Sequence, residues 1–380
     1  MSHRTFRVMI LHGYSARNRG DGLLVDETVA LIREAFGDDT DITLLASDPE
    51  SFRRLPVSVF CTRPSLRGWK MDYLRQLFRL NRYDLVVGVG GGYLRAGTFS
   101  EALKCAIVMG PQLLAAAVTS APTVYLPQSI GPLRGGTRIP YRILLNRLSQ
   151  VMLRDDRSVT ELQLRNAVRY PDLAISSPEF TSRRDSDGPP ATDIVISVRS
   201  IRGSVPTPVK VLSEQLRDAG VPITGYVQST VGGNDDAQAQ QQITPDSALN
   251  EDEYLRQGTG QNAPRRVVVA VRLHAALLAL RAGHRVIHLA YERKGFSAFA
   301  DLGLEEWVHN VNSFDPTVVA AQALALRDDP DTGKRYDDLL RSRLPMLSKR
   351  HEDLVGDLRH AVGGTDGTSP TPEDPKDHVK

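Results

Sequence analysis

The chain has 380 residues, enough for two domains, and 41% of them are hydrophobic, which supplies apolar side chains for two cores. Its formal net charge of only +2 argues against a dedicated nucleic-acid-binding protein. Two cysteines without ligand-like spacing indicate thiols in a reducing compartment, and no apolar run reaches the ~20 residues of a membrane helix. We therefore expect a cytoplasmic protein.

The first half of the chain alternates between apolar runs typical of strands and amphipathic segments typical of helices. Strands are predicted at residues 6–11, 41–46, 83–89, 123–126 and 151–154. Helices are predicted at 23–36, at 102–119 with a kink at Gly110-Pro111, and from Ser158 with Asp155 or Asp156 near the N-cap. This alternation indicates a parallel sheet with right-handed crossovers.

Three loops that follow these strands carry polar or glycine residues: Asn18 and Asp21; Gly90, Gly91 and Gly92; and Gln128 and Ser129. We expect Asp21 to cap the next helix and Asn18 to face a substrate. The glycine turn either brings backbone amides close to an anionic ligand or serves packing, and Tyr93 at the third glycine position argues against a dinucleotide site. The amide and hydroxyl groups of Gln128 and Ser129 suit sugar recognition.

Residues 63–82 combine six Lys and Arg residues with apolar ones at helical spacing. Such a segment is typical either of a basic face that contacts anionic lipid or of a solvated surface helix with one packed side. The second interpretation is favoured from the sequence alone.

The second half of the chain repeats the alternation after a polar, proline-bearing stretch, 181–192, which reads as a linker. Strands are predicted at 193–198, 222–227, 266–271 and 285–290, and helices at 209–219, 251–257, 272–283, 296–302, 315–327 and 331–360. The polar, Gln-rich segment 232–259 is either a lid or a disordered insertion. Residues 363–380 have almost no apolar side chains and are expected to form a disordered tail.

The strongest functional signal is Arg272-Leu273-His274, which lies where a buried strand of small apolar residues ends and a helix begins. Ligands of open α/β sheets bind at that edge, where helix N–H groups favour anions. Arg199 ends the first strand of the second half in the same way, and Lys294 follows a later strand. We expect these side chains to hold an anionic ligand and His274 to transfer a proton.

Other chemistries find less support in the sequence. The histidines His12, His284 and His288 have no metal-ligand spacing with carboxylates, so we predict no metal site. Neither a phosphate-binding Walker A sequence nor a Gly-x-Ser-x-Gly nucleophile turn is present.

A set of these motifs, taken in order, resembles the polysaccharide pyruvyl transferase family from Phe6 to about Trp307. The motifs are Asn18-x-Gly20-Asp21, Gly90-Gly91-Gly92, Gln128-x-Ile130-Gly131-Pro132, Arg154-Asp155-x-x-Ser158, Pro171-Asp172, Ser197-Val198-Arg199 and Arg272-Leu273-His274. The resemblance implies a GT-B-like α/β fold of two Rossmann-like domains that face a cleft. The expected division is an N-terminal domain at 1–180 on the acceptor side, a linker at 181–192, a C-terminal domain at 193–362 with the donor site, and a tail at 363–380.

The resemblance also implies the reaction: a transferase that moves the pyruvyl group of phosphoenolpyruvate onto sugar hydroxyls of a cell-surface glycan or its precursor as a ketal. Phosphoenolpyruvate is then a co-substrate, and no cofactor is expected. Donor binding falls to Arg199, Arg272, Leu273, His274 and Lys294, with His274, Arg272 and Arg199 as catalytic residues. Acceptor binding falls to Asn18, Asp21, Gly90, Gly91, Gly92, Gln128 and Ser129.

Three alternatives stay open at this point. The same cleft would serve a GT-B glycosyltransferase that uses a nucleotide sugar, and a non-catalytic carbohydrate-binding relative would share the fold. The same chemistry on a small metabolite is the third. The acceptor is expected to be a glycan or a lipid-linked or nucleotide-linked sugar, with peripheral contact at the inner face of the membrane as a further option, and without nucleic acid.

Overall fold

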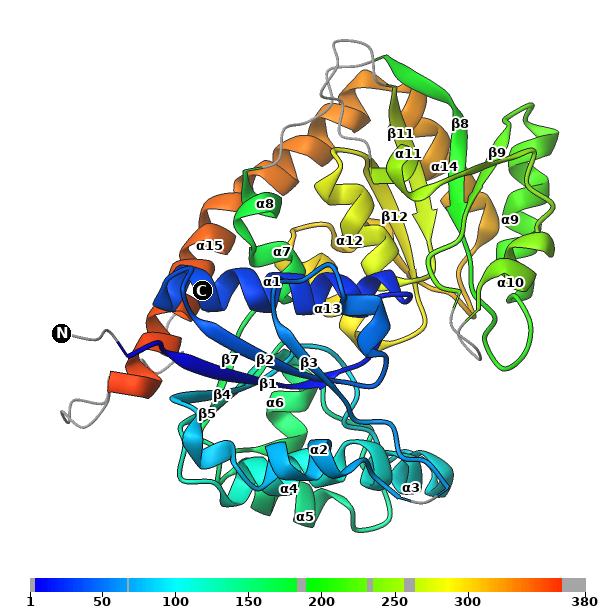
Figure 1. The fold of residues 1–380 in the computed structure, drawn as a ribbon. Helices are drawn as coiled ribbons and strands as arrows, with labels where there is room; N and C mark the ends of the chain where they lie inside the picture. The colour runs from blue at the N-terminus through cyan, green and yellow to red at the C-terminus, as the bar shows by residue number, and fades with distance from the viewer. Residues whose placement is uncertain (1–3, 67, 183–188, 231–234, 256–263, 364–380) are drawn as a thin grey trace.

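The computed structural model describes residues 4–66, 68–182, 189–230, 235–255 and 264–363. These residues form two parallel α/β units, one above the other in Figure 1. The expected fold class is confirmed. The predicted tail lies outside the described residues from 364 onward, as does half of the predicted linker, residues 183–188.

The first unit is built on a parallel sheet of seven strands within the described residues, in the order β3-β2-β1-β4-β5-β6-β7. The strands are β1 (Arg7–Gly13), β2 (Asp41–Ala46), β3 (Ser58–Cys61), β4 (Leu85–Gly88), β5 (Thr123–Gln128), β6 (Gln150–Leu153) and β7 (Ala167–Arg169). Its helices are α1 (Arg19–Phe36), α2 (Met71–Leu77), α3 (Phe99–Val108), α4 (Gly110–Val118), α5 (Arg138–Leu145) and α6 (Asp156–Leu162). The short helices α7 (Leu173–Ser176) and α8 (Pro178–Thr181) follow, and their Ala174, Ile175 and Phe180 belong to the core of the second unit.

The second unit has a parallel sheet of six described strands, in the order β10-β9-β8-β11-β12-β13. The strands are β8 (Pro190–Ser197), β9 (Ile223–Tyr226), β10 (Ser247–Leu249), β11 (Arg265–Ala270), β12 (Arg285–Ala290) and β13 (Val308–Asn310). Its helices are α9 (Thr207–Asp218), α10 (Ala237–Gln241), α11 (Glu251–Leu255), α12 (Leu273–Arg281), α13 (Arg293–Asp301), α14 (Pro316–Asp328) and α15 (Pro330–Gly363).

Strand order explains where a ligand site has to lie. In the first sheet the chain runs outward from β1 to β3 and then returns to place β4 on the other side of β1. The second sheet does the same at β8 and β11. At such a reversal the loops after the two central strands diverge and leave a crevice at the carboxyl edge of the sheet. The loops after β1, β4, β8 and β11 are those that carry Asn18, Gly90, Arg199 and Arg272.

The predicted bounds of the second domain are corrected at its start and at its end. Strand β8 begins at Pro190, inside the predicted linker, because Pro190 already pairs with Arg265 of β11, ahead of a register shift between Arg265 and Val267. Helix α15 is shared: Tyr336, Leu340 and Leu347 belong to the core of the second unit, whereas Leu354, Val355 and Leu358 belong to a core of the first. The end of the 193–362 segment therefore packs on the first unit, and Figure 1 shows α15 running from the second unit to the first.

The 232–259 segment is corrected as well. Its described part, 235–255, folds into α10, β10 and α11, and β10 is the edge strand of the second sheet. Two side chains explain why this polar segment is ordered. The Gln240 side chain hydrogen-bonds the backbone of Ile196 and Val198, and Tyr254 stacks on Tyr226 with 3.6 Å between ring centroids.

The helical region after β4 is divided as its sequence predicted. Helices α3 and α4 meet at Met109 with a bend of 56°, and Pro111 stands in the first turn of α4, where its missing N–H costs nothing. In the described part of the chain no single helix has the length and apolar composition to cross a membrane, although this bent pair meets both criteria when its helices are joined.

Candidate active site

A cavity of about 540 Å³ lies between the two units, at the carboxyl edge of both sheets. Three helices, α1, α12 and α13, begin at its wall, so partly positive helix ends face it. Six cationic side chains line it: Arg95, Lys104, Arg154, Arg199, Arg272 and Lys294. The acidic lining residues are Asp21, Glu101 and Glu292. The excess of positive charge suits a small ligand with more than one anionic group.

His274 lies in the first turn of α12 and its ring packs against Gly20 at the start of α1. The approach is close enough that a Cβ on Gly20 would lie 2.3 Å from His274 Nδ1. His274 Nε2 is buried, without a hydrogen-bond partner among the described residues, and lies 4.0 Å from Asp172 Oδ2. Glycine at position 20 is therefore what allows the imidazole to occupy this place.

The ionisation of His274 is set by burial. Burial lowers its pKa to about 3; Asp172 acts in the opposite direction, while Arg154, Lys294 and Arg272 lower the pKa further. The imidazole is thus neutral at pH 7. In the ligand-free protein His274 is a proton acceptor, and the general-acid role requires that it first receive a proton.

Arg154 was not among the predicted site residues, yet it lies at the centre of a buried network. Its Nη1 is paired with Asp172, its Nε donates to Ser129 Oγ at 3.1 Å, and Asp172 Oδ1 accepts from the backbone of Ala174 at 3.0 Å. Its Nη2 is buried and finds no hydrogen-bond partner in the described part of the chain. A Cβ on Gly92 would be 3.6 Å from that nitrogen, so Arg154 offers a donor beside the glycine turn.

Arg272 lines the cavity while two of its nitrogens are engaged by Asp236. The Nη2–Oδ1 distance is 2.7 Å, and Nε pairs with the other carboxylate oxygen. Burial raises the pKa of Asp236, whereas Arg272 lowers it. Asp236 belongs to the 232–259 segment, so this segment orients an arginine of the predicted donor site rather than only covering it.

Arg199 and Lys294 are held by neighbouring side chains that follow β12. Arg199 Nη1 donates to Tyr291 Oη at 2.6 Å, and its guanidinium carbon is 4.7 Å from the centroid of that ring. Lys294 Nζ is 2.9 Å from Glu292 Oε2. Burial disfavours the charge of Glu292, but Lys294 and Arg95 outweigh it and lower its pKa to about 2. The Arg95–Glu292 pair joins the two units at 2.5 Å.

The predicted acceptor residues separate into two groups. Asn18, Asp21, Gly90, Gly91 and Gly92 line the cavity. Gln128 is completely buried and does not line it, because its Cα pairs with Leu153 within the sheet. Ser129 lines a neighbouring cavity of about 350 Å³ and acts on the main one through Arg154.

Asp21 does not cap α1. The helix begins at Arg19, with Asn18 at the N-cap, and Asn18 Nδ2 donates to Asp21 Oδ2 at 2.8 Å. The N-cap differs from the predicted one because a backbone hydrogen bond closes the turn from Ser15 to Asn18. The helix therefore begins earlier than its apolar pattern indicates. Burial raises the pKa of Asp21 to about 6, against the effect of Lys294 and other cations.

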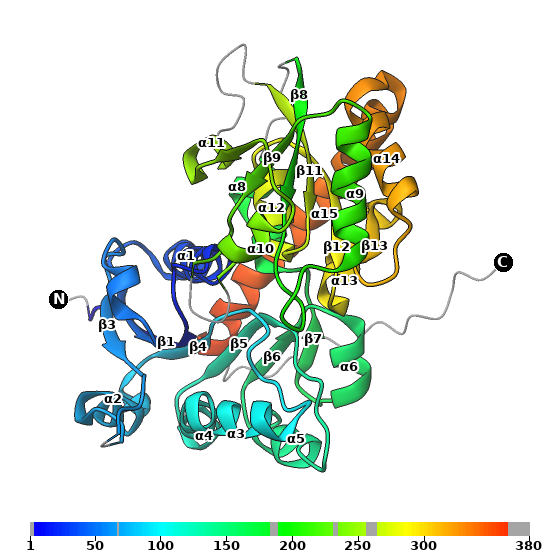
Figure 2. The ribbon, with the colours of Figure 1, turned by 90° about the vertical axis from the view of Figure 1, so that its right-hand side faces the viewer.

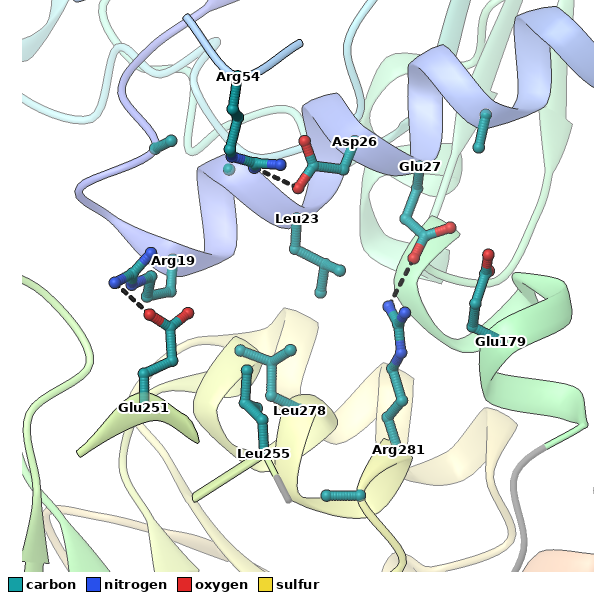
Figure 3. A pocket seen from close by; sticks show the side chains of 14 residues that line it. Arg19, Leu23, Asp26, Glu27, Arg54, Glu179, Glu251, Leu255, Leu278 and Arg281 are labelled. Carbon is teal, nitrogen blue, oxygen red and sulfur yellow. Dashed lines mark hydrogen bonds and ion pairs between the residues drawn. The ribbon is translucent and has the colours of Figure 1, made fainter. Parts of the chain in front are cut away.

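A second cavity, about 460 Å³, lies on the other side of α1 and contains none of the predicted site residues. Figure 3 shows charged pairs around it that join the two units: Arg19 with Glu251, and Glu27 with Arg281 at 2.8 Å. Because these opposite charges are paired with each other, the cavity has no excess of positive charge. Its charged residues hold the two units together. Among the residues that the structure describes, no group of three or more His, Cys, Asp or Glu side chains could hold a metal ion.

Comparisons with known proteins identify a family and a shared fold. The model of the polysaccharide pyruvyl transferase family matches residues 18–293. Solved structures share the fold at low identity. A putative UDP-N-acetylglucosamine 2-epimerase from Listeria monocytogenes has a TM-score of 0.60 at 12% identity, covering 96% of this chain and 98% of the other. A glycosyltransferase from Rickettsia africae has a TM-score of 0.55 at 8% identity, covering 96% of this chain and 100% of the other.

A mutant O-GlcNAc transferase from Thermobaculum terrenum has a TM-score of 0.52 at 14% identity, covering 96% of this chain and 69% of the other. At these identities the likeness concerns the fold alone. A comparison with curated proteins gives no match.

Proposed function

The chain belongs to the polysaccharide pyruvyl transferase family, and on that premise we propose that it transfers the pyruvyl group of phosphoenolpyruvate onto two hydroxyls of a sugar, as a ketal. The acceptor is a cell-surface glycan or its precursor. The observation that carries the proposal is the cavity in which a neutral His274 lies among Arg154, Arg272 and Lys294 at the start of three helices. The proposal includes a cytoplasmic location, which the free thiols of Cys61 and Cys105 support.

The donor carries a carboxylate and a phosphate, and the cavity offers several cations for them. Arginine binds such groups through paired N–H donors, whereas lysine acts as a point charge. We assign Arg154, Arg199 and Arg272 to the donor, with Lys294 and the helix N-termini adding positive potential. This cationic wall neutralises the phosphate as it leaves.

The proposed reaction requires that protons move in a defined order. One sugar hydroxyl attacks C2 of phosphoenolpyruvate and loses its proton, while the methylene C3 gains a proton and becomes a methyl group. The C2–O bond to phosphate then breaks, which leaves an oxocarbenium centre. The second hydroxyl attacks this centre, and its proton passes to the released phosphate. The products are the ketal and inorganic phosphate.

His274 suits the first of these steps. Its neutral imidazole accepts the hydroxyl proton, and because burial makes the imidazolium strongly acidic, that proton becomes available to the methylene carbon. Asp172 lies 4.0 Å from Nε2 and stabilises the charge that appears on the ring during the transfer.

The direct test is incubation with phosphoenolpyruvate and a panel of glycans, in which phosphate release and a ketal methyl signal are followed. The variant His274→Ala is expected to lose about 10²- to 10⁴-fold in kcat. The matched control is His309→Ala, which removes a half-buried histidine bonded to Gln322, outside the cavity, and should retain activity.

Two outcomes would contradict the proposal. Undiminished activity in His274→Ala would remove His274 from the mechanism. Binding of a uridine diphosphate without binding of phosphoenolpyruvate would point instead to transfer from a nucleotide sugar.

A further inference from the structure

Helices α3, α4 and α5 of the first unit expose apolar side chains at a spacing of four residues, which places each set on one helix face. The exposed members are Phe99, Leu103 and Ile107 on α3, Leu114 and Val118 on α4, and Ile139 and Ile143 on α5. Phe99 is 85% exposed and Ile139 65%. We call these seven residues the outer apolar face.

The same helices bury their opposite sides. Cys105 of α3, Leu113 of α4 and Leu145 of α5 belong to the core on this side of the first sheet. The helices therefore lie flat on the sheet, and the outer apolar face is additional to what the core requires. Figures 1 and 2 both place α2 to α5 together at the end of the molecule that is away from the second sheet.

The part of the sequence that contains this face is rich in positive charge. Residues 63–147 contain twelve Lys and Arg residues against three Asp and Glu residues, whereas the whole chain has a net charge of only +2. Exposed examples are Lys70 before α2, Lys104 on α3, and Arg134 and Arg138 at the start of α5. Nearby, α2 and the residue that follows it add Met71 and Phe78, which are 62% and 86% exposed.

We propose that the outer apolar face and its basic surroundings are a docking surface for an anionic membrane. Exposed apolar side chains on flat-lying helices insert at the boundary of headgroups and acyl chains, and surrounding Lys and Arg side chains are attracted to anionic headgroups. A second copy of this chain fits less well, because its face would bring the same positive charges together.

Helix α3 connects this surface to the cavity. Lys104 and Val108 line the cavity, while Leu103 and Ile107 of the same helix belong to the outer apolar face. Docking therefore brings one wall of the cavity close to the bilayer surface, where a membrane-anchored sugar would be presented. The docking itself does not depend on which reaction the cavity performs.

Sedimentation with lipid vesicles tests the proposal on the full chain. Binding is expected to vesicles that contain phosphatidylglycerol, to be weak or absent with phosphatidylcholine alone, and to weaken as salt is raised. The variant Leu103→Ser/Ile107→Ser/Ile143→Ser should bind the anionic vesicles about tenfold more weakly or worse. The matched control, Val318→Ser/Met346→Ser, alters residues of the second unit that are 47% and 39% exposed and should bind like the parent.

A charge variant keeps the test valid should the serine variant fold poorly. Arg134→Glu/Arg138→Glu leaves the apolar residues in place and should also weaken binding to anionic vesicles. Absence of binding to anionic vesicles would overturn the proposal, as would equal binding by the parent and the charge variant. Light scattering that shows a dimer of the parent and a monomer of the serine variant would overturn it in favour of a second copy. Phosphate release, measured separately with a water-soluble acceptor, distinguishes failure of docking from failure of the proposed reaction.

Discussion

At the scale of single residues, the contact between Gly20 and His274 joins the two units at the wall of the cavity. The two residues are far apart in sequence, and each lies in the first turn of a helix that begins at the cavity wall. A side chain at position 20 is excluded because the imidazole already occupies the space. The motif residue Gly20 therefore contributes to the site because, without a side chain, it leaves space for the ring of His274.

Gly20→Ala tests this contact. The added Cβ would lie 2.3 Å from Nδ1 and 2.7 Å from Cγ of His274, so the ring has to move. Because catalysis depends on placement within about an ångström, we expect a loss of about 10²-fold in kcat, measured by phosphate release. The control is Gly356→Ala in α15, where nothing lies within 4 Å of a Cβ, and activity should be unchanged. Equal activity of the two variants would show that the contact is unimportant.

Arg154 shows that residue type and position alone do not reveal whether an arginine at a strand end belongs to the site. Its position directly after β6 is the same signal that identified Arg199 and Arg272, and its motif was recognised, yet many strand-end arginines are solvated. Its pairing with Asp172 and its unsatisfied Nη2 become visible only when β6, the loop after β7 and the glycine turn lie together.

At the scale of elements, the structure of α10 and its neighbours changes the interpretation of the 232–259 segment. Its polar composition predicted a lid or a disordered insertion, but Asp236, just before α10, is 1% exposed and holds Arg272. Composition could not reveal this, since one buried carboxylate in a polar run is indistinguishable from its exposed neighbours.

Asp236→Ala is expected to act on both stability and donor binding. Removal of the carboxylate leaves Arg272 as a buried charge without this partner, which costs about 3–5 kcal/mol of unfolding free energy. Because Arg272 is then no longer oriented, the KM for phosphoenolpyruvate should rise by about tenfold or more. The neighbouring Asp235→Ala is the control: Asp235 is exposed and accepts from Ala237 N at 2.9 Å, so KM should stay constant. A KM unchanged in Asp236→Ala would contradict the orienting role.

The elements themselves were predicted where the period of the sequence was clear. Strands β1, β2, β5, β11 and β12 and helices α1, α9, α12, α14 and α15 were predicted within a few residues of their observed bounds. Strands β3, β7, β10 and β13 were not, because each is a short edge strand of three or four residues, half-exposed, with one partner. A run of that length carries too little hydrophobic pattern to predict its pairing.

At the scale of the whole molecule, buried histidines couple stability to pH. Burial lowers the pKa of His12 to about 3; its Nε2 is 2.7 Å from Tyr125 Oη and its Nδ1 is buried without a partner among the described residues. The folded pKa lies below the unfolded value of about 6.5. The unfolded chain therefore takes up this proton first, and stability present above pH 6.5 is lost as the pH falls.

His12→Gln should make the unfolding free energy less dependent on pH. Between pH 7 and pH 5 the parent is expected to lose about 2 kcal/mol more than the variant, as measured by denaturant titration at both pH values. Asp21 and Glu27, whose pKa values burial raises, act in the opposite direction, and the comparison of parent and variant cancels their effect. Equal losses in both proteins would show that His12 is not protonated on unfolding.

The sequence by itself determined the α/β alternation, the two units and the strand-end position of Asn18, Gly90, Arg199, Arg272 and His274, because local hydrophobic period and turn chemistry set these features. Only the tertiary structure decided which strand ends face one another across the cavity, that α15 returns to the first unit, and that Asp236 and Asp172 hold the arginines. The physical reason is that burial and charge pairing depend on segments distant in sequence, which no local pattern encodes.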